Sequence, residues 1–119
     1  MSDYTLLSTH DHVDYTVDWD RLSQIYTVAP LPIEQSPERL RLAYENSQVC
    51  CYAWQGDTLV GACRALADND YWGFICDLVV DPSHQKQGLG RKILDWTIKE
   101  LAVEKVILAC VKGQEGFYE

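Results

Sequence analysis

The sequence lacks the marks of a secreted, membrane or metal-binding protein. Its first 15 residues contain no basic cluster followed by an apolar stretch, so no signal peptide is expected. No apolar run approaches the ~18 residues of a transmembrane helix. Histidine occurs only three times, and the five cysteines show no CxxC spacing, which argues against a metal site or a disulfide framework. We therefore expect a cytoplasmic protein with buried, reduced thiols and no metal.

Basic residues are also scarce, and they are unevenly placed. The 119 residues carry a formal net charge of −8, which argues against nucleic acid or an anionic membrane as the main partner. Residues 1–81 hold 13 acids and 4 bases, whereas residues 82–119 hold 5 acids and 6 bases. The acidic residues 1–81 would attract a cationic ligand, and the nearly neutral residues 82–119 would tolerate bound phosphates. The length predicts a single domain over 1–119.

The hydrophobic pattern predicts a mixed α/β sheet. Alternating or continuous apolar runs mark the strands, and apolar residues three and four apart mark the helices. Two prolines in Ala29-Pro-Leu-Pro-Ile33 separate the first two helices, because proline breaks the backbone hydrogen-bond ladder. Residues 71–80 are apolar at nearly every position, so we expect them to be buried on both faces. The expected strands are 2–8, 12–17, 48–55, 58–67, 71–80 and 105–111, and the expected helices are 19–28, 37–46 and 89–103, with a helical start at 114–119.

A turn that opens directly onto a helix follows the buried strand. The glycines of Gln85-Lys-Gln-Gly-Leu-Gly90 permit positive φ and a close approach to the backbone. Amide groups at a helix N-terminus bind anions, and Lys86, Arg91 and Lys92 add positive charge there. These cations oppose the helix dipole, so a bound polyanion would stabilise them.

Two common phosphate-binding loops do not fit this turn. A Rossmann fingerprint requires glycine where Ile93 stands, and a Walker A loop requires Lys and then Ser or Thr after Gly90. A plain glycine turn before a helix is the remaining alternative. The pattern Gln-x-x-Gly-x-Gly over 85–90, after Val-x-Pro over 80–82, resembles the acetyl-CoA pyrophosphate loop of the GNAT N-acetyltransferase superfamily.

The resemblance extends along the chain. Asp77-Leu-Val-Val is similar to the family's central strand, Lys105-Val-Ile-Leu-Ala-Cys to the next parallel strand, and Gly116-Phe-Tyr-Glu119 to the start of its Phe-Tyr-x-x-x-Gly-Phe segment. Ala65-Leu-Ala and Ile75-Cys-Asp are similar to small bacterial and plastid amine acetyltransferases of the serotonin-acetyltransferase-like kind. The resemblance implies the GNAT fold and acetyl-CoA-dependent transfer of an acetyl group to a primary amine, by direct attack in a ternary complex.

The resemblance also implies where the cofactor lies. In this family the central strand and its parallel neighbour separate at a β-bulge, and the pantetheine arm pairs with the strand in the gap. The backbone of Leu78, Val79 and Val80 is therefore implied to contact pantetheine, with a free N–H for the thioester oxygen. The residues implied to contact or adjoin the pyrophosphate are Gln85, Lys86, Gln87, Gly88, Leu89, Gly90 and Arg91.

Two residues are implied to carry the acid–base chemistry. Tyr118 matches the family tyrosine beside the cofactor sulfur, and a phenol, with an ordinary pKa of about 10, can donate a proton to the departing thiolate. Asp77 is the candidate base, because it is a carboxylate on an otherwise apolar strand; a structural carboxylate is the alternative. Glu34 can line the acceptor mouth or be a solvated loop residue, and His84 is a neighbour of solvent or phosphate. Tyr26, Leu31 and Ile33 are implied to border the acceptor.

Two other functions stay open at this point. A non-catalytic acyl-CoA-binding regulatory domain would keep the turn without the acid–base pair, and a structural α/β domain would make the turn accidental. The family usually continues past Phe-Tyr with two further strands, whereas this sequence ends at Glu119. We therefore expect one of two situations. Either the chain is truncated and its C-terminal strands are missing, or it is a short form that completes its sheet with a partner subunit. Such a partner would be a homodimer subunit at the edge over 105–111.

Overall fold

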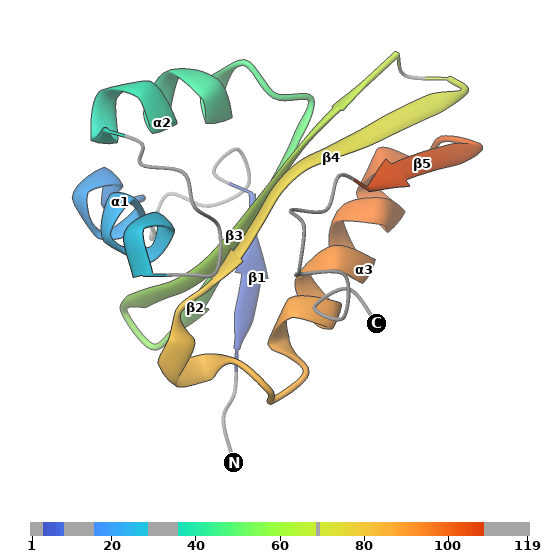
Figure 1. Cartoon of the computed structure of the whole chain (residues 1–119). Helices are drawn as coiled ribbons and strands as arrows, with labels where there is room; N and C mark the ends of the chain where they lie inside the picture. Colours follow the sequence, from blue (N-terminus) through green and yellow to red (C-terminus); the bar gives the residue numbers. More distant parts are fainter. Residues whose placement is uncertain (1–3, 9–15, 29–35, 69, 109–119) are drawn as a thin grey trace.

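The computed structural model describes residues 4–8, 16–28, 36–68 and 70–108. Within them, five strands form one sheet in the order β1-β2-β3-β4-β5 (Figure 1). The first four strands pair as antiparallel neighbours, and β4 and β5 are parallel. The elements are β1 (Thr5–Leu7), α1 (Trp19–Val28), α2 (Pro37–Glu45), β2 (Val49–Gln55), β3 (Thr58–Ala67), β4 (Trp72–Val80), the 3-10 helix η1 (Pro82–His84), α3 (Leu89–Leu101) and β5 (Lys105–Leu108).

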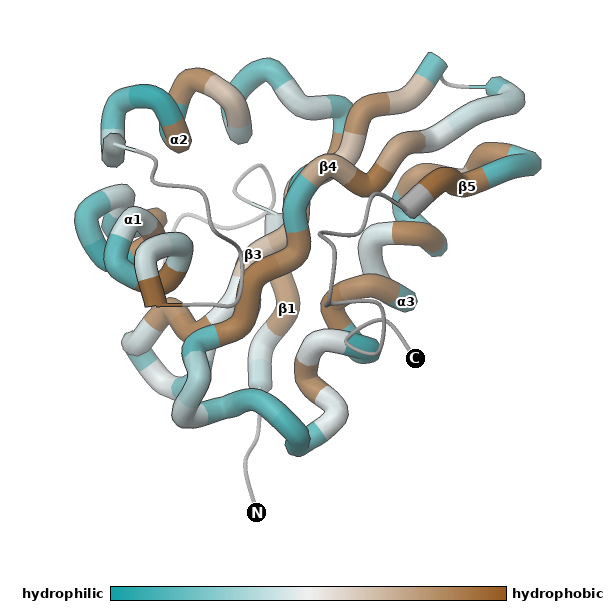
Figure 2. The backbone as a smooth tube through the Cα atoms, viewed as in Figure 1, coloured by the Kyte–Doolittle hydropathy of each residue, from teal (hydrophilic) through white to brown (hydrophobic). Residues whose placement is uncertain are grey.

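The helices cover both faces of the sheet. α1 and α2 lie on one face and α3 lies on the other (Figure 1). The sheet therefore separates two hydrophobic clusters, one with Leu22 and Tyr26 of α1, the other with Leu89 and Ile93 of α3. In Figure 2, hydrophobic colour follows β3 and β4 through the middle of the molecule. The expectation that residues 71–80 are buried on both faces is confirmed for Leu78, Val79 and Val80. It is wrong for the first part of the strand, where Tyr71, Trp72 and Phe74 are exposed because no helix covers that side of the hairpin tip.

Local capping explains where the first two helices begin. The Asp18 carboxylate accepts hydrogen bonds from the backbone N–H groups of Asp20 and Arg21, both at 3.1 Å. Ser36 caps α2, and proline occupies its first turn. The expected strand at 12–17 is wrong in its described part, because Thr16 and Val17 lead into the Asp18 cap rather than into a ladder.

An irregularity in β4 shapes the sheet. Arg64 of β3 lies opposite Asp77, and the next residue, Ala65, lies opposite Ile75. Cys76 is therefore an extra residue without a partner on β3, which is a β-bulge. Bulges bend the strand that carries them, and this one lies at the middle of β4.

The described pairing of the two parallel strands lies on one side of the bulge. Among the described residues, β5 pairs with β4 from Trp72 to Ile75, and the residues that follow Leu108 lie outside the described ranges. Within the described residues, no strand pairs with the segment from Cys76 to Val80 on that side, and Figure 1 shows β4 continuing past the end of β5. β1 lies at the opposite edge, so it does not cover β5.

The described thiols are free and mostly buried. Cys50, Cys51 and Cys63 are buried, and Cys76 is half-buried; Cys110 lies outside the described residues. Burial raises the pKa of Cys50 to about 11 and that of Cys63 to about 12, so both are protonated at neutral pH. Among the described residues no cluster of three or more possible metal ligands occurs, and none of their helices is long and apolar enough to cross a membrane.

Candidate functional site

The turn between β4 and α3 has the backbone of an anion-binding nest. Lys86 and Gly88 both adopt left-handed conformations, with φ of 62° and 81°. Left-handed residues alternating with ordinary ones direct successive N–H groups into one concavity. A Cβ built on Gly88 meets no atom within 4 Å, so the space beside this backbone is open.

The first turn of α3 adds donors to this concavity. No side chain caps the helix at Gly88, and the first helical bond runs from the Lys92 N–H to the Gly88 carbonyl at 3.1 Å. The N–H groups of Leu89, Gly90 and Arg91 therefore have no intrahelical acceptor. Together with the helix dipole, they favour a bound anion.

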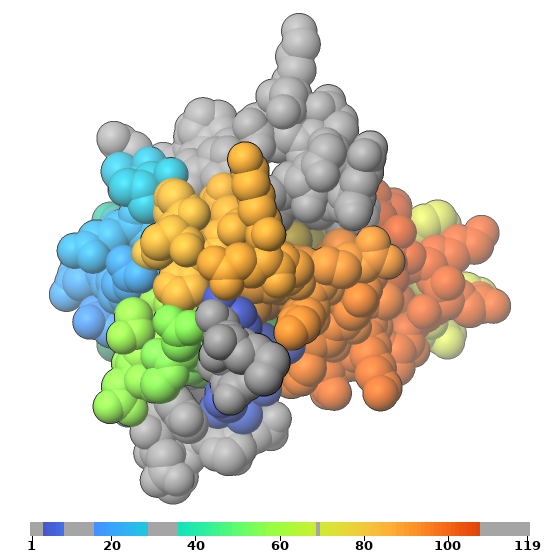
Figure 3. Space-filling view, turned by 90° about the horizontal axis from the view of Figure 1, so that it is seen from below, coloured from blue at the N-terminus to red at the C-terminus, as the bar shows by residue number. Residues whose placement is uncertain are grey.

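Side-chain contacts fix the turn to the sheet and to α1. The Gln85 amide donates to the Val80 carbonyl at 2.9 Å, and Asp81 accepts from the backbone of Ser83 at 2.9 Å and pairs with Arg21 of α1. Partial burial opposes ionisation of Asp81, but the bonds from Ser83 and Arg21 together lower its pKa. Figure 3 shows the turn, in amber, between α1 in blue and α3 in orange.

Beyond the bulge, the backbone groups of β4 alternate between the β3 side and the opposite side of the strand. The Asp81 N–H donates to the Val60 carbonyl of β3 at 2.8 Å, and amides alternate in direction along a strand. The Val79 groups therefore face β3, in agreement with the 3.1 Å from the Val79 oxygen to a Cβ built on Gly61. The Leu78 N–H and carbonyl consequently face away from β3, and among the described residues no strand pairs with them.

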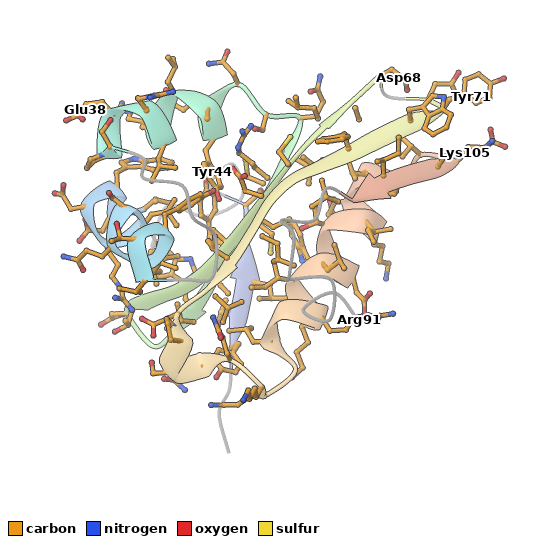
Figure 4. The ribbon with its side chains drawn as sticks, in the orientation of Figure 1. Glu38, Tyr44, Asp68, Tyr71, Arg91 and Lys105 are labelled. Carbon is orange, nitrogen blue, oxygen red and sulfur yellow. The ribbon has the colours of Figure 1, made fainter. Side chains whose placement is uncertain are left out.

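The Asp77 carboxylate lies on the α1/α2 side of β4 in a network of polar side chains. Its Oδ2 accepts from the Tyr26 hydroxyl at 2.9 Å and from Arg64 Nε at 2.8 Å. The Tyr26 hydroxyl also contacts that of Tyr44 at 2.9 Å, and Figure 4 shows Tyr44 on α2 directed toward the sheet. Within the described part of the chain, Asp77 Oδ1 has no hydrogen bond. Asp77 thus has structural contacts through Oδ2, and none of the described residues bonds to its Oδ1.

The structure brings most of the expected cofactor residues to one end of β4. Leu78 and Val80 lie in the last part of β4, and 85–90 form the concavity that follows it. Arg91 instead pairs with Asp95 one turn along α3 at 3.1 Å, and its side chain extends away from the turn in Figure 4. The expected site residues outside the described ranges are Leu31, Glu34, Ile33 and Tyr118.

The sequence interpretation missed two arginines that the structure places at the site. Arg21 supports the turn, and Arg64 holds Asp77. Arg64 could have been found from the hairpin, because it is the only cation in 58–67 and its register places it opposite the acid in 71–80. Tyr26, implied to border the acceptor, has a fully buried side chain, with 0% exposed.

Comparisons with known proteins agree on one family. The model of the acetyltransferase (GNAT) family matches residues 16–119. Serotonin N-acetyltransferase 2 of Oryza sativa, a chloroplastic protein, is 30% identical over 86% of this chain and 54% of its own length. A ycf52-like N-acetyltransferase of Prochlorococcus marinus is 28% identical over 68% of this chain and 49% of its own. The chain spans about half the length of these curated relatives.

A solved structure shares the arrangement of elements. The GNAT-family acetyltransferase from Streptococcus pneumoniae superposes with a TM-score of 0.73 at 26% identity, covering 99% of this chain and 83% of that one. The mixed sheet with three helices is therefore the fold of that structure, over nearly all of this chain.

Proposed function

Because the chain belongs to the GNAT acetyltransferase family, we propose that it transfers the acetyl group of acetyl-CoA to a primary amine. The observation that carries the proposal is the backbone of β4 beyond the bulge, whose Leu78 groups face away from β3, next to the nest at the start of α3. Backbone groups that face away from the partner strand, with an anion site at the end of the strand, match in order a thioester arm and the diphosphate that follows it.

The residues of the turn fit the diphosphate of coenzyme A. The nest supplies backbone donors, the space at Gly88 is open, and Lys86 and Lys92 are exposed cations nearby. We propose that the N–H groups of 86–91 hold the diphosphate. Arg91 would contribute its side chain only by leaving its pair with Asp95.

The backbone of β4 is proposed to hold the arm and polarise the reacting carbonyl. Acetyl-CoA supplies an acetyl group activated as a thioester. The Leu78 N–H faces away from β3 and can donate to the carbonyl oxygen, on which negative charge develops when an amine attacks. Removal of one such donor typically slows an enzyme ~10²- to 10³-fold.

Asp77 and Tyr118 remain the proposed acid–base pair. An attacking amine must lose a proton, and Asp77 Oδ1 is the carboxylate oxygen that its neighbours Tyr26 and Arg64 leave without a bond. Tyr118, through its match to the family tyrosine, is proposed to protonate the departing thiolate. Asp77→Asn keeps an acceptor for Tyr26 and Arg64 while it removes the base, so turnover should fall ~10²-fold or more, with a smaller change in coenzyme A affinity.

The proposed acceptor is a small cationic amine. The acidic N-terminal part attracts cations, and the rice relative is a serotonin N-acetyltransferase by name. The test is coenzyme A release across a panel of arylalkylamines, polyamines, amino sugars and peptides, with calorimetric titration of acetyl-CoA. Binding together with turnover of one amine supports the proposal. Binding without release for any amine would favour a non-catalytic acyl-CoA-binding domain, and absence of binding would refute both.

A further inference from the structure

A tyrosine from the far end of the sequence contacts the turn. Tyr4 precedes the edge strand β1, yet its hydroxyl lies 2.9 Å from His84 Nδ1 and 3.1 Å from Gln87 Oε1. The Tyr4 and His84 rings also meet edge to face, with centroids 5.7 Å apart. One phenol thus joins η1 to the residue that precedes Gly88.

The donor and acceptor in each of these hydrogen bonds can be assigned by starting from the bond between Gln87 and Ser83. The Gln87 Nε2 group lies 3.4 Å from the Ser83 carbonyl, which can only accept, so the Gln87 amide nitrogen faces Ser83 and its oxygen faces Tyr4. A phenol has one hydrogen, which it donates to Gln87 Oε1. The Tyr4 oxygen must then accept from His84, so Nδ1 carries the imidazole hydrogen.

These hydrogen bonds link residues on both sides of Lys86, whose backbone is the most constrained in the turn. Lys86 lies between the two residues that Tyr4 bonds, and it is a non-glycine residue in the left-handed region, at φ 62°. Such a conformation costs on the order of 1 kcal/mol or more and persists only where neighbours enforce it. The Tyr4 ring packs against the hydrophobic cluster under α3, and β1 pairs with β2 directly after it, so its position is set independently of the turn.

We propose that Tyr4 is a positioning residue for the cofactor diphosphate. Its hydroxyl holds His84 and Gln87 at the spacing that keeps Lys86 left-handed and the nest formed before any ligand binds. The conformational entropy of the turn is then lost when the protein folds, so its loss does not weaken ligand binding. The inference rests on the proposed function for its ligand, but the brace itself is a property of the free protein.

Tyr4→Phe is the sharpest test, because it removes only the hydroxyl and keeps the ring in its cluster. In the free protein, the amide protons of His84 and Gln85, which bond to the carbonyls of Asp81 and Pro82 at 2.8 and 3.3 Å, should exchange ~3- to 10-fold faster, as expected for one lost hydrogen bond. The Kd for coenzyme A should rise by a similar factor. The Kd for pantetheine, which lacks the diphosphate, should not change.

Two controls separate the brace from general stability. Tyr71→Phe removes a hydroxyl at the tip of the β3–β4 hairpin, far from the turn (Figure 4), and should change none of these values. His84→Asn retains an N–H donor for Tyr4 and should bind coenzyme A more tightly than His84→Leu. Wild-type exchange and affinity in Tyr4→Phe, or an equal loss for coenzyme A and pantetheine, would overturn the proposal. If the wild-type protein binds no coenzyme A, faster exchange in Tyr4→Phe would leave the brace standing while the proposed function, and with it the cofactor role, fails.

Discussion

Removing the hydroxyl of Tyr26 should cost far more stability than removing that of its hydrogen-bonded partner Tyr44. Asp77 Oδ2 can only accept, so Tyr26 donates its hydrogen to it, and the Tyr44 hydroxyl must therefore donate to Tyr26. Both tyrosines are buried, with 0% and 2% of their surface exposed. The network therefore has a direction, from Tyr44 through Tyr26 to Asp77.

The magnitudes follow from that direction. Tyr26→Phe removes a hydrogen bond to a charged acceptor and leaves the buried Tyr44 hydroxyl without an acceptor, a total of about 3–5 kcal/mol. Tyr44→Phe removes one neutral hydrogen bond and leaves no buried donor unpaired, about 0.5–1.5 kcal/mol. The double variant leaves no unpaired donor either, so it should cost about 1–2 kcal/mol less than the sum of the single variants.

Urea unfolding of the wild type, both single variants and the double variant gives the three differences in free energy directly. The control is Tyr71→Phe. Tyr71 is 56% exposed, so the change in unfolding free energy should be within ~0.5 kcal/mol. Equal costs for the two single variants, or a double variant equal to their sum, would show that the hydrogen-bond direction is wrong.

Three further outcomes are expected. Gly88→Ala should destabilise the protein by only about 1–2 kcal/mol, because its φ of 81° is strained for alanine although the space is open, whereas Gly88→Glu should abolish coenzyme A binding in a calorimetric titration. Gly61→Ala should cost about 1–3 kcal/mol in urea unfolding, because its Cβ would lie 2.8 Å from Ile93 Cδ1; an unchanged midpoint would contradict this packing. Above pH 9, stability should fall by about 1.4 kcal/mol per pH unit for each buried thiol, because the thiols of the unfolded chain ionise near their ordinary value of 9.0 while Cys50 and Cys63 stay protonated to about 11 and 12. Unfolding at pH 8, 9 and 10 should show a slope that becomes shallower in the alanine variant of either cysteine.

The elements were predictable because local signals agree with the packing. β3 was predicted with its exact bounds, since Gly56-Asp57 fixes one turn and Asp68 begins the next. The strand expected at 12–17 failed in its described part, because Thr16 and Val17 lead directly into α1, whose first amides the Asp18 carboxylate caps.

The parts of the site formed by consecutive residues were predictable from the sequence, whereas the contacts between distant residues were not. The turn at 85–90 could be read because its donors are consecutive backbone groups. The partners of that turn and of Asp77 could not, because Tyr4, Arg21 and Tyr26 approach from elements distant in sequence. Only Arg64 could have been placed, through hairpin register. Long-range side-chain contacts leave no periodic trace in one sequence.

The effect of the extra residue Cys76 can be judged by comparing β4 with a strand that is one residue shorter. On either side of Cys76 the strand keeps its alternation: Ile75, Leu78 and Val80 belong to the cluster under α3, while Val79 belongs to the other. A chain shorter by that single residue would therefore retain both clusters and gain an uninterrupted ladder. The extra residue changes the composition of neither hydrophobic cluster, and it interrupts the regular pairing of β3 with β4. Folding alone therefore does not require Cys76, and deleting this one residue would turn the bulged strand into a regular one.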